Sequence, residues 1–196
     1  MIARPATSRS REHAHRSERP VSVDDMIIRE ATSGDAYAIA RVHVRSWQAA
    51  YAGLMPQTVL DGLSVDDRAA AWTRIIADAG SASRVVVAQR DGEIVAWASF
   101  GPAREEDLPG AGELYGIYAD PDSWSTGAGH ALLASVEESL RAAGHRGAYL
   151  WVLEGNDRAA HFYERHGWIA DGEIKLDERG AMTLRELRRV KAFGRT

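Results

Sequence analysis

The sequence predicts an α/β protein of the α+β type, and two features of the chain carry this prediction. A strand pattern over residues 113–119 runs through the turn Asp120-Pro121-Asp122 and a glycine-containing loop into a helix pattern. Two further strand patterns, 85–88 and 93–101, flank Asp91-Gly92, a dipeptide typical of tight β-hairpins. Strand and helix patterns continue in both directions from these features, which indicates a sheet covered by helices.

Residues 26–80 read as one short strand followed by helices. The strand is expected at 26–30, and Thr32 or Ser33 can cap a helix whose apolar residues keep helical spacing to Tyr51. Pro56 can begin a short helix. The buried stripe of the next helix is expected at Ala69, Trp72, Ile75, Ile76 and Ala79.

The rest of the chain alternates in the same way. The charged run 104–107 is expected to be a solvated loop. A strand is expected at 148–153, a turn at Asp171-Gly172 and a final strand at 182–189. The helix after the glycine loop is expected to bury Ala128, Leu132, Leu133, Val136, Leu140 and Ala143. The helix after residues 154–157 is expected to turn Ala159, Ala160, Phe162, Tyr163 and His166 inward.

The strand, glycine loop and helix start at 113–129 form a candidate anion site. The first turn of a helix leaves N–H groups without partners, and glycine lets a ligand approach the backbone closely. A P-loop or a dinucleotide fingerprint would need glycine spacings that this loop lacks. This loop by itself does not exclude the alternative, an ordinary helix N-terminus built from small residues that binds no ligand.

Composition excludes several classes of protein. The 196 residues carry a net charge of −4, which argues against a basic nucleic-acid binder, and no apolar run approaches the length of a membrane span. The chain has no cysteine, so disulfides, thiolate metal sites and a cysteine acyl-enzyme are excluded. We expect no metal site and a cytoplasmic setting.

Residues 1–25 are predicted to be a disordered tail, and residues 26–196 a single domain. The tail is rich in arginine and has no apolar periodicity, so it cannot bury enough surface to fold. His13 and His15 lie within it and are expected to bind no metal.

Two segments resemble the signatures of the GNAT acetyltransferase superfamily. Residues 124–129 resemble its pyrophosphate loop, Gln/Arg-x-x-Gly-x-Gly/Ala, except that Trp124 stands where the family has Gln or Arg. Residues 156–168 resemble its second signature, Asn-x-x-Ala-x-x-Phe-Tyr-x-x-x-Gly-Phe, with Trp168 in place of the last Phe. The resemblance covers about residues 27–189, and both signatures occur in the family's order.

The resemblance implies a GNAT fold, a mixed sheet of about seven strands whose two parallel strands splay apart around acetyl-coenzyme A. Asn156 would hydrogen-bond the pantetheine arm; the alternative is a helix cap, and both roles can hold together. The residues implied to bind the cofactor are Ile117, Tyr118, Ala119, Trp124, Ser125, Thr126, Gly127, Ala128, Gly129, Asn156 and Tyr163.

The resemblance also implies catalytic roles. Glu113 lies fourteen residues before Gly127 (127 − 113 = 14), the spacing at which family members place a strand glutamate that acts as general base. Tyr163 would be the general acid for the departing thiolate. The alternatives without a catalytic role are that Glu113 is a strand-edge carboxylate facing water and that Tyr163 is a helix tyrosine packed in the protein. Trp47 and Tyr51 are expected to contact the acceptor, or else simply to pack on the sheet. Tyr115 and Trp151 are also expected to contact the acceptor.

The function implied is acetyl-coenzyme A-dependent N-acetyl transfer to a primary amine of a small molecule or peptide, by direct attack without a covalent enzyme intermediate. The alternative is a non-catalytic GNAT-fold module that binds acyl-coenzyme A. We expect no nucleic-acid or membrane partner, and many relatives are homodimers, so a homodimer stays open. The sequence does not name the acceptor.

Overall fold

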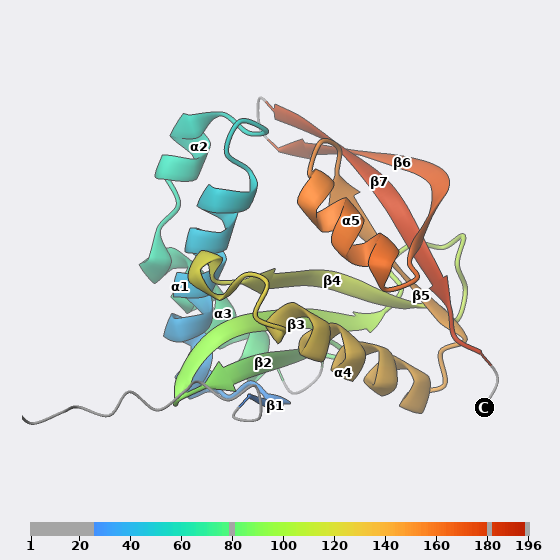
Figure 1. Ribbon diagram of the computed structural model, residues 1–196, viewed down its shortest axis with the longest axis horizontal. Coiled ribbons are helices and arrows are strands. Elements are labelled where there is room, and N and C mark those ends of the chain that lie inside the picture. The colour runs from blue at the N-terminus through green and yellow to red at the C-terminus, as the bar shows by residue number, and fades with distance from the viewer. Residues whose placement is uncertain (1–25, 79–80, 180–181, 195–196) are drawn as a thin grey trace, which may run out of the picture.

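The computed structural model describes residues 26–78, 81–179 and 182–194 and shows a mixed sheet with helices on both sides (Figure 1). Within these residues the sheet has seven strands in the order β1-β2-β3-β4-β5-β7-β6. This confirms the predicted mixed sheet. The strands are β1 (Ile27–Glu30), β2 (Arg84–Arg90), β3 (Glu93–Pro102), β4 (Gly112–Ala119), β5 (Gly147–Leu153), β6 (Ile169–Arg179) and β7 (Met182–Ala192).

Two helices begin at a residue whose side chain caps them. The Ser64 hydroxyl accepts a hydrogen bond from the Asp67 N–H at 3.1 Å, and the Asn156 side chain accepts one from the Ala159 N–H at 3.1 Å. The helices are α1 (Ala36–Ala50), α2 (Gln57–Asp61), α3 (Val65–Ala77), α4 (Ala128–Ala142) and α5 (Asp157–Arg165), with short 3-10 turns at η2 (Ser33–Asp35) and η3 (Pro121–Ser123).

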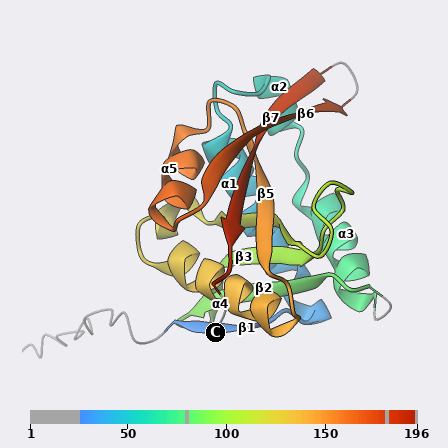
Figure 2. The same cartoon turned by 90° about the vertical axis from the view of Figure 1, so that its right-hand side faces the viewer.

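Each face of the sheet buries a separate apolar core. In β2, Val85 and Val87 pack with α1 and α3, whereas Val86 and Ala88 pack with α4 and α5 on the opposite face. This is the period-two alternation expected of a strand that is covered on both sides. Figure 2 shows α3 and the α4–α5 pair on opposite sides of the strands.

The sheet opens between β4 and β5, its parallel pair of strands. These strands pair only at Gly112↔Ala148 and Glu113↔Tyr149. From Gly116 to Ala119, β4 keeps β3 as its partner, but no described strand pairs with its other edge. Backbone groups on that edge therefore face a gap rather than a neighbouring strand.

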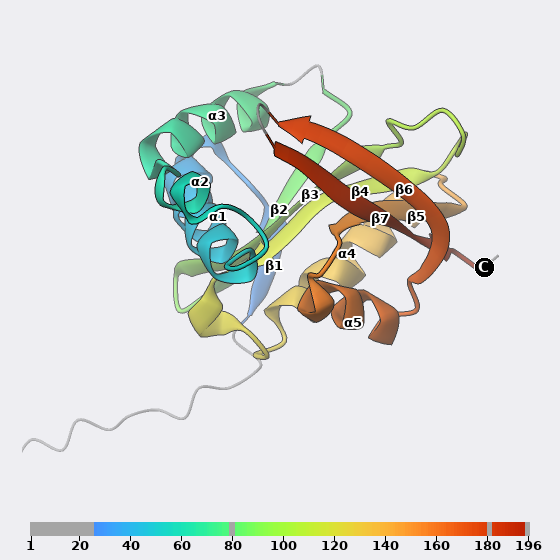
Figure 3. The same cartoon turned by 90° about the horizontal axis from the view of Figure 1, so that it is seen from above.

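The β6–β7 hairpin extends from the opening toward the N-terminal helices (Figure 3). Leu184 near its tip is buried with Met55 and Leu60. The predicted turn at Asp171-Gly172 is wrong, because this pair forms an irregularity inside β6, where Gly172 takes φ +95°. A glycine inside a strand commonly marks such a bulge.

Two other expectations about burial are wrong. Ile75 is 46% exposed because α3 rests on α1 through Trp72 and Ile76 instead. Ala143 is exposed because α4 ends at Ala142. The predicted tail and Ala79 lie outside the described residues.

Candidate active site

A pocket of about 1030 Å³ occupies the opening between β4 and β5. It continues from the loop before α4, past α5, to a wall formed by α1 and the β6–β7 hairpin. All residues expected to contact the acceptor line it, as do both expected catalytic residues. These residues are Trp47, Tyr51, Glu113, Tyr115, Trp151 and Tyr163.

The loop before α4 presents free backbone amides at one end of the pocket. Ser125 and Gly127 take φ values of +62° and +92°, and a Cβ added to Gly127 would meet nothing within 4 Å. Within the described chain, the N–H groups of residues 125–130 meet no hydrogen-bond acceptor. Such a group of unpaired amides at a helix N-terminus suits an anion.

Not every residue expected at this end lines the pocket. Ser125, Gly127 and Gly129 do, together with Trp124 and Asn156. Thr126 and Ala128 do not. The Thr126 hydroxyl donates to the Ser123 carbonyl at 2.7 Å, and Ala128 is buried in the core under α4.

Trp124, which departs from the family pattern, is paired with a cation that the sequence analysis missed. The Trp124 indole N–H donates to the Ala119 carbonyl at 2.9 Å, which fixes the ring beside the loop. The Arg158 guanidinium lies over this ring, 3.9 Å from its centre, and Arg158 lines the pocket. Arg158 is two residues after Asn156, in the first turn of α5. This position was the sequence signal that could have placed Arg158 near the site.

Tyr163 faces the pocket from α5 near the free edge of β4. Its ring is packed against Phe162 and Trp168, and its hydroxyl makes no hydrogen bond to another described residue. Burial is the main cause that raises the pKa of this hydroxyl far above its usual range. Tyr163 therefore keeps its proton at neutral pH and can donate it.

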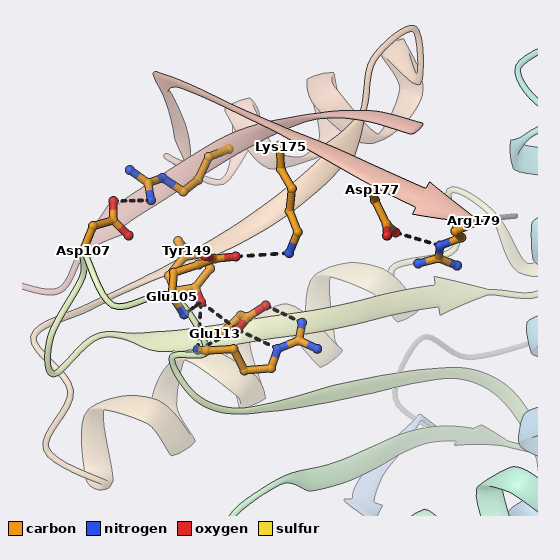
Figure 4. A network of polar contacts seen from close by, with 9 residues as sticks. Glu105, Asp107, Glu113, Tyr149, Lys175, Asp177 and Arg179 are labelled. Atoms are coloured by element: carbon orange, nitrogen blue, oxygen red, sulfur yellow. Dashed lines mark hydrogen bonds and ion pairs between the residues drawn. The ribbon is translucent and has the colours of Figure 1, made fainter. Parts of the chain in front are cut away.

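Glu113 lies at the last point where β4 and β5 pair, and it is 1% exposed. One carboxylate oxygen accepts from the Tyr149 hydroxyl at 2.7 Å and from the Arg104 backbone and side-chain N–H groups at 3.1 and 2.9 Å. The other oxygen pairs with the same guanidinium. Figure 4 shows this network beneath the hairpin. The bonds leave Glu113 fixed rather than facing water.

Residues 104–107 lie in a largely exposed loop, as expected, but its charges are paired with other parts of the chain. Besides the Arg104–Glu113 pair, Glu105 pairs with Lys175 of β6 at 3.1 Å, and Asp107 pairs with Arg188 of β7 at 2.7 Å (Figure 4). The opposite charges lie more than 60 residues further along the chain, so local sequence could not reveal them. These ion pairs hold the loop against β4 and against the β6–β7 hairpin.

Aromatic rings form the wall on the α1 side. The Tyr51 and Tyr118 hydroxyls are 2.8 Å apart, and the Trp47 ring lies 5.1 Å from that of Tyr51. His43 is surrounded by the rings of this cluster, and its Nδ1 accepts from the Trp72 indole N–H at 3.2 Å. The proton of the neutral imidazole is therefore on Nε2.

The other two expected acceptor residues lie on the opposite side of the pocket. The Tyr115 hydroxyl donates to the Pro102 carbonyl at 2.8 Å, and the Arg104 guanidinium lies over its ring. Lys175 lies over the Trp151 ring, 5.5 Å from its centre.

Sequence reasoning also missed Glu186, which lines the pocket from β7. It is half-buried, and within the described residues it forms no ion pair or hydrogen bond. Burial, followed by the negative charge of Asp177, raises the pKa of its carboxyl group. An alternating strand pattern gives no sign of which charged residue faces a cavity, so no local signal was available.

Other kinds of site find no support in the described residues. Their histidines and carboxylates form no cluster able to hold a metal ion. Their helices include none that is long and apolar enough to cross a membrane.

Comparisons with known proteins agree with this architecture. YuaI of Bacillus subtilis, an uncharacterized N-acetyltransferase, is 38% identical over 130 residues, which cover 66% of this chain and 72% of YuaI. A GCN5-related N-acetyltransferase structure from Rhodopseudomonas palustris superposes with a TM-score of 0.70 at 17% identity, covering 90% of this chain and all of that one.

Another solved structure with this fold holds a ligand. The PaiA N-acetyltransferase of Thermoplasma acidophilum, in complex with coenzyme A, superposes with a TM-score of 0.64 at 17% identity, covering 86% of this chain and 99% of PaiA. The model of the acetyltransferase (GNAT) family matches residues 43–168, which is more than half of the chain. The chain therefore belongs to the acetyltransferase (GNAT) family of enzymes.

Proposed function

We propose that this enzyme transfers an acetyl group from acetyl-coenzyme A to a primary amine of a small molecule or peptide. The observation that carries the proposal is one continuous pocket with free backbone amides at one end, an unpaired strand edge and Tyr163 in the middle, and a polar wall at the other end. Family membership and the coenzyme A complex of PaiA support the same cosubstrate.

The residues present fit a long cosubstrate with phosphates at one end. The amides of residues 125–129 would hold the pyrophosphate, and Arg158 would add a positive charge there. The free edge of β4 at Ile117–Ala119 would hydrogen-bond the pantetheine arm. The Asn156 side-chain oxygen already caps α5, so any contact with the arm would come from its remaining amide hydrogens.

The chain's own residues would position the reactants and manage the protons. Acetyl-coenzyme A supplies an acyl thioester. A backbone N–H on the free edge of β4 would polarise its carbonyl, and Tyr163 would give its proton to the departing thiolate. The chain has no cysteine, which is consistent with direct attack by the amine.

A non-catalytic acyl-coenzyme A-binding module is the second candidate. An open, amide-lined loop would serve binding alone equally well. However, binding alone gives no reason for a protonated tyrosine hydroxyl without a hydrogen-bond partner in the middle of the pocket. Turnover of an amine separates the two candidates.

The first experiment is a thermal-shift assay with acetyl-coenzyme A, coenzyme A and AMP in parallel, followed by an amine panel with free thiol as the readout. A ligand at about 100 times its Kd stabilises the native state by roughly 2.7 kcal/mol. We expect both coenzyme A forms, but not AMP, to raise the Tm, and at least one amine to release thiol. Stabilisation without turnover of any amine would favour the binding module, and the absence of any shift would remove the cofactor site.

A further inference from the structure

We propose that Glu186 is the general base of this enzyme, and that it selects a cationic primary amine by receiving its ammonium group. This inference rests on the proposed acetyl transfer. It assigns the proton-accepting role to a residue on β7 rather than to Glu113 on β4.

Strand register places Glu186 on the pocket side of β7. It pairs with Leu153 of β5 and with Lys175 of β6. Leu184 lies two residues away, so it shares the same face, and it is buried against α1 and α2. Glu186 therefore lies on the hairpin wall, beside the point where β5 ends and the cofactor-binding residue Asn156 follows.

Glu186 is the charged group on this wall that has no fixed partner. Among the described residues lining the acceptor end, Arg104 pairs with Glu113, Lys175 with Glu105, and Asp177 with Arg179 at 2.7 Å (Figure 4). Each of these pairs is neutral overall. Glu186 remains as one negative charge facing the pocket, and a cationic ligand is the complement of such a charge.

Glu113 is arranged less favourably for the same task. Both of its oxygens are held by a guanidinium, and it also accepts from the Tyr149 hydroxyl and the Arg104 backbone. A base must turn a lone pair to the amine, and Glu113 would first have to break these bonds. Glu186 is half-buried and has no bond to break.

A pair of hydroxyls lines the same pocket as Glu186 and Tyr163 and interacts with both. The Tyr51 and Tyr118 hydroxyls hydrogen-bond each other at 2.8 Å. Burial is the main cause that raises the pKa of both, and the charge of Glu186 raises it further. The Tyr118 hydroxyl also contributes to the raised pKa of Tyr163. The proposed base and the proposed acid thus both interact with the same hydroxyl pair.

The proton and electron balance is complete with these groups. Glu186 takes one proton from the ammonium group, which leaves a neutral amine. The amine nitrogen forms the bond to the thioester carbonyl carbon, the C–S bond breaks, and Tyr163 protonates the departing sulfur. The nitrogen of the intermediate then loses its excess proton, which restores the Tyr163 hydroxyl, and the amide product keeps one N–H. Glu186 releases the proton it took to water, so one proton is released per turnover. Burial raises the pKa of the Glu186 carboxyl group. The difference between this pKa and the pKa of an alkylammonium group, about 10, is therefore smaller than for an exposed glutamate.

The pH dependence follows from the charge state of the base. Glu186 must be ionised to act, so kcat/KM rises with pH through its pKa. With a neutral side chain at this position, the rate depends on the fraction of neutral amine and rises steadily toward pH 10. Besides burial, Asp177 raises the pKa of Glu186, and Arg179, Lys175 and Arg104 lower it. The hydroxyls of Tyr51 and Tyr118 also interact with its charge.

The test compares Glu186→Gln with Glu178→Gln in the full chain, using an amine that the wild type acetylates. Glu178 lies on the same hairpin but is exposed and does not line the pocket. We expect Glu186→Gln to lower kcat/KM by about 100-fold or more near pH 7, lose the acidic limb of the profile and recover as pH rises. Acetyl-coenzyme A affinity and the Tm should not fall, and Glu178→Gln should match the wild type.

Glu186→Asp and a neutral acceptor control for a structural effect. The aspartate variant keeps the charge and should retain more activity than the glutamine variant, with its acidic limb intact. The acetylation of a weakly basic aniline, which is neutral at pH 7, should be far less sensitive to Glu186→Gln. A glutamine variant with wild-type rate and pH profile would overturn the role of Glu186 while leaving acetyl transfer standing. A wild type that binds coenzyme A but acetylates no amine would overturn both proposals.

Discussion

The Arg158 guanidinium stacks on the Trp124 indole, 3.9 Å from the centre of the ring, beside the loop of free amides. The family pattern has Gln or Arg where this chain has Trp124. The stacked pair supplies a cation from α5 at this end of the pocket. The indole fixes the position of the guanidinium, and its own N–H is held by the Ala119 carbonyl.

Replacing Arg158 with glutamine should weaken coenzyme A binding by about 10- to 100-fold, because a charge-assisted hydrogen bond contributes roughly 1.5–3 kcal/mol. Isothermal titration with coenzyme A measures the effect. Acetyl-pantetheine lacks the phosphates, so its KM should be unchanged in the same variant. An equal loss with both ligands would place Arg158 elsewhere than at the phosphates.

Trp124→Ala should weaken coenzyme A binding less than Arg158→Gln does, because the indole acts through the guanidinium. Binding by the double variant should then be close to that of Arg158→Gln alone. Titration of all four proteins gives the coupling energy. Additive losses would show that the two side chains act independently.

Tyr163→Phe should lower kcat by roughly 100-fold with little change in acetyl-coenzyme A affinity. The ring packing against Trp168 is kept, and only the hydroxyl is lost. Pre-steady-state turnover and ligand titration separate the two quantities. The exposed Tyr37→Phe serves as the matched control. An unchanged kcat would exclude Tyr163 as the acid.

Glu113→Gln separates a structural role from a catalytic one. The substitution removes the charge that the Arg104 guanidinium contacts and that raises the pKa of that guanidinium. We expect a loss of about 2–3 kcal/mol in the free energy of unfolding, measured by denaturant titration, because hydrogen bonds to a buried charge are weakened. The loop 103–111 should also become more susceptible to proteolysis.

The pH–rate profile of Glu113→Gln decides whether this residue is also the base, as its spacing predicts. A profile with the wild-type acidic limb and a modest fall in kcat would indicate positioning. A lost acidic limb, combined with a wild-type profile for Glu186→Gln, would restore Glu113 to the role of base.

The sequence predicted the elements that local patterns encode. The Asp91-Gly92 hairpin, the Ser64 and Asn156 caps and the glycine loop before α4 all lie where local chemistry places them. Resemblance then supplied the splayed sheet. The long β6 was missed because Gly172 interrupts its alternation with a bulge that resembles a turn.

The charged residues of the site were predicted less well, because their partners are distant in the chain. In the loop that contains Arg104, Glu105 and Asp107 contact residues of β6 and β7 that lie 70 and 81 positions further along the chain, and no local pattern encodes such contacts. Strand register places Glu186 at the pocket, and stacking on Trp124 places Arg158 beside the loop of free amides. Those properties exist only after folding.

His43 should make the stability of the protein depend on pH. It is 8% exposed, and burial, with a smaller contribution from the charge of Arg68, lowers its pKa to about 4. In the unfolded chain this pKa is about 6.5, so between these values the unfolded state binds the additional proton. The stabilising effect of the neutral imidazole is thus complete above pH 6.5 and is lost as pH falls toward 4. From pH 7.5 to 5 the expected loss is about 2 kcal/mol.

Guanidinium titrations at both pH values, for wild type and His43→Gln, measure that loss. The glutamine does not titrate, and its amide oxygen can still accept from the Trp72 indole N–H. The variant should therefore lose less stability than the wild type between pH 7.5 and 5, although it is less stable at pH 7.5 because the ring packing is gone. His161→Gln, a replacement at an exposed histidine, serves as the matched control. Equal pH dependence in wild type and His43→Gln would mean that folding does not lower the pKa of this imidazole.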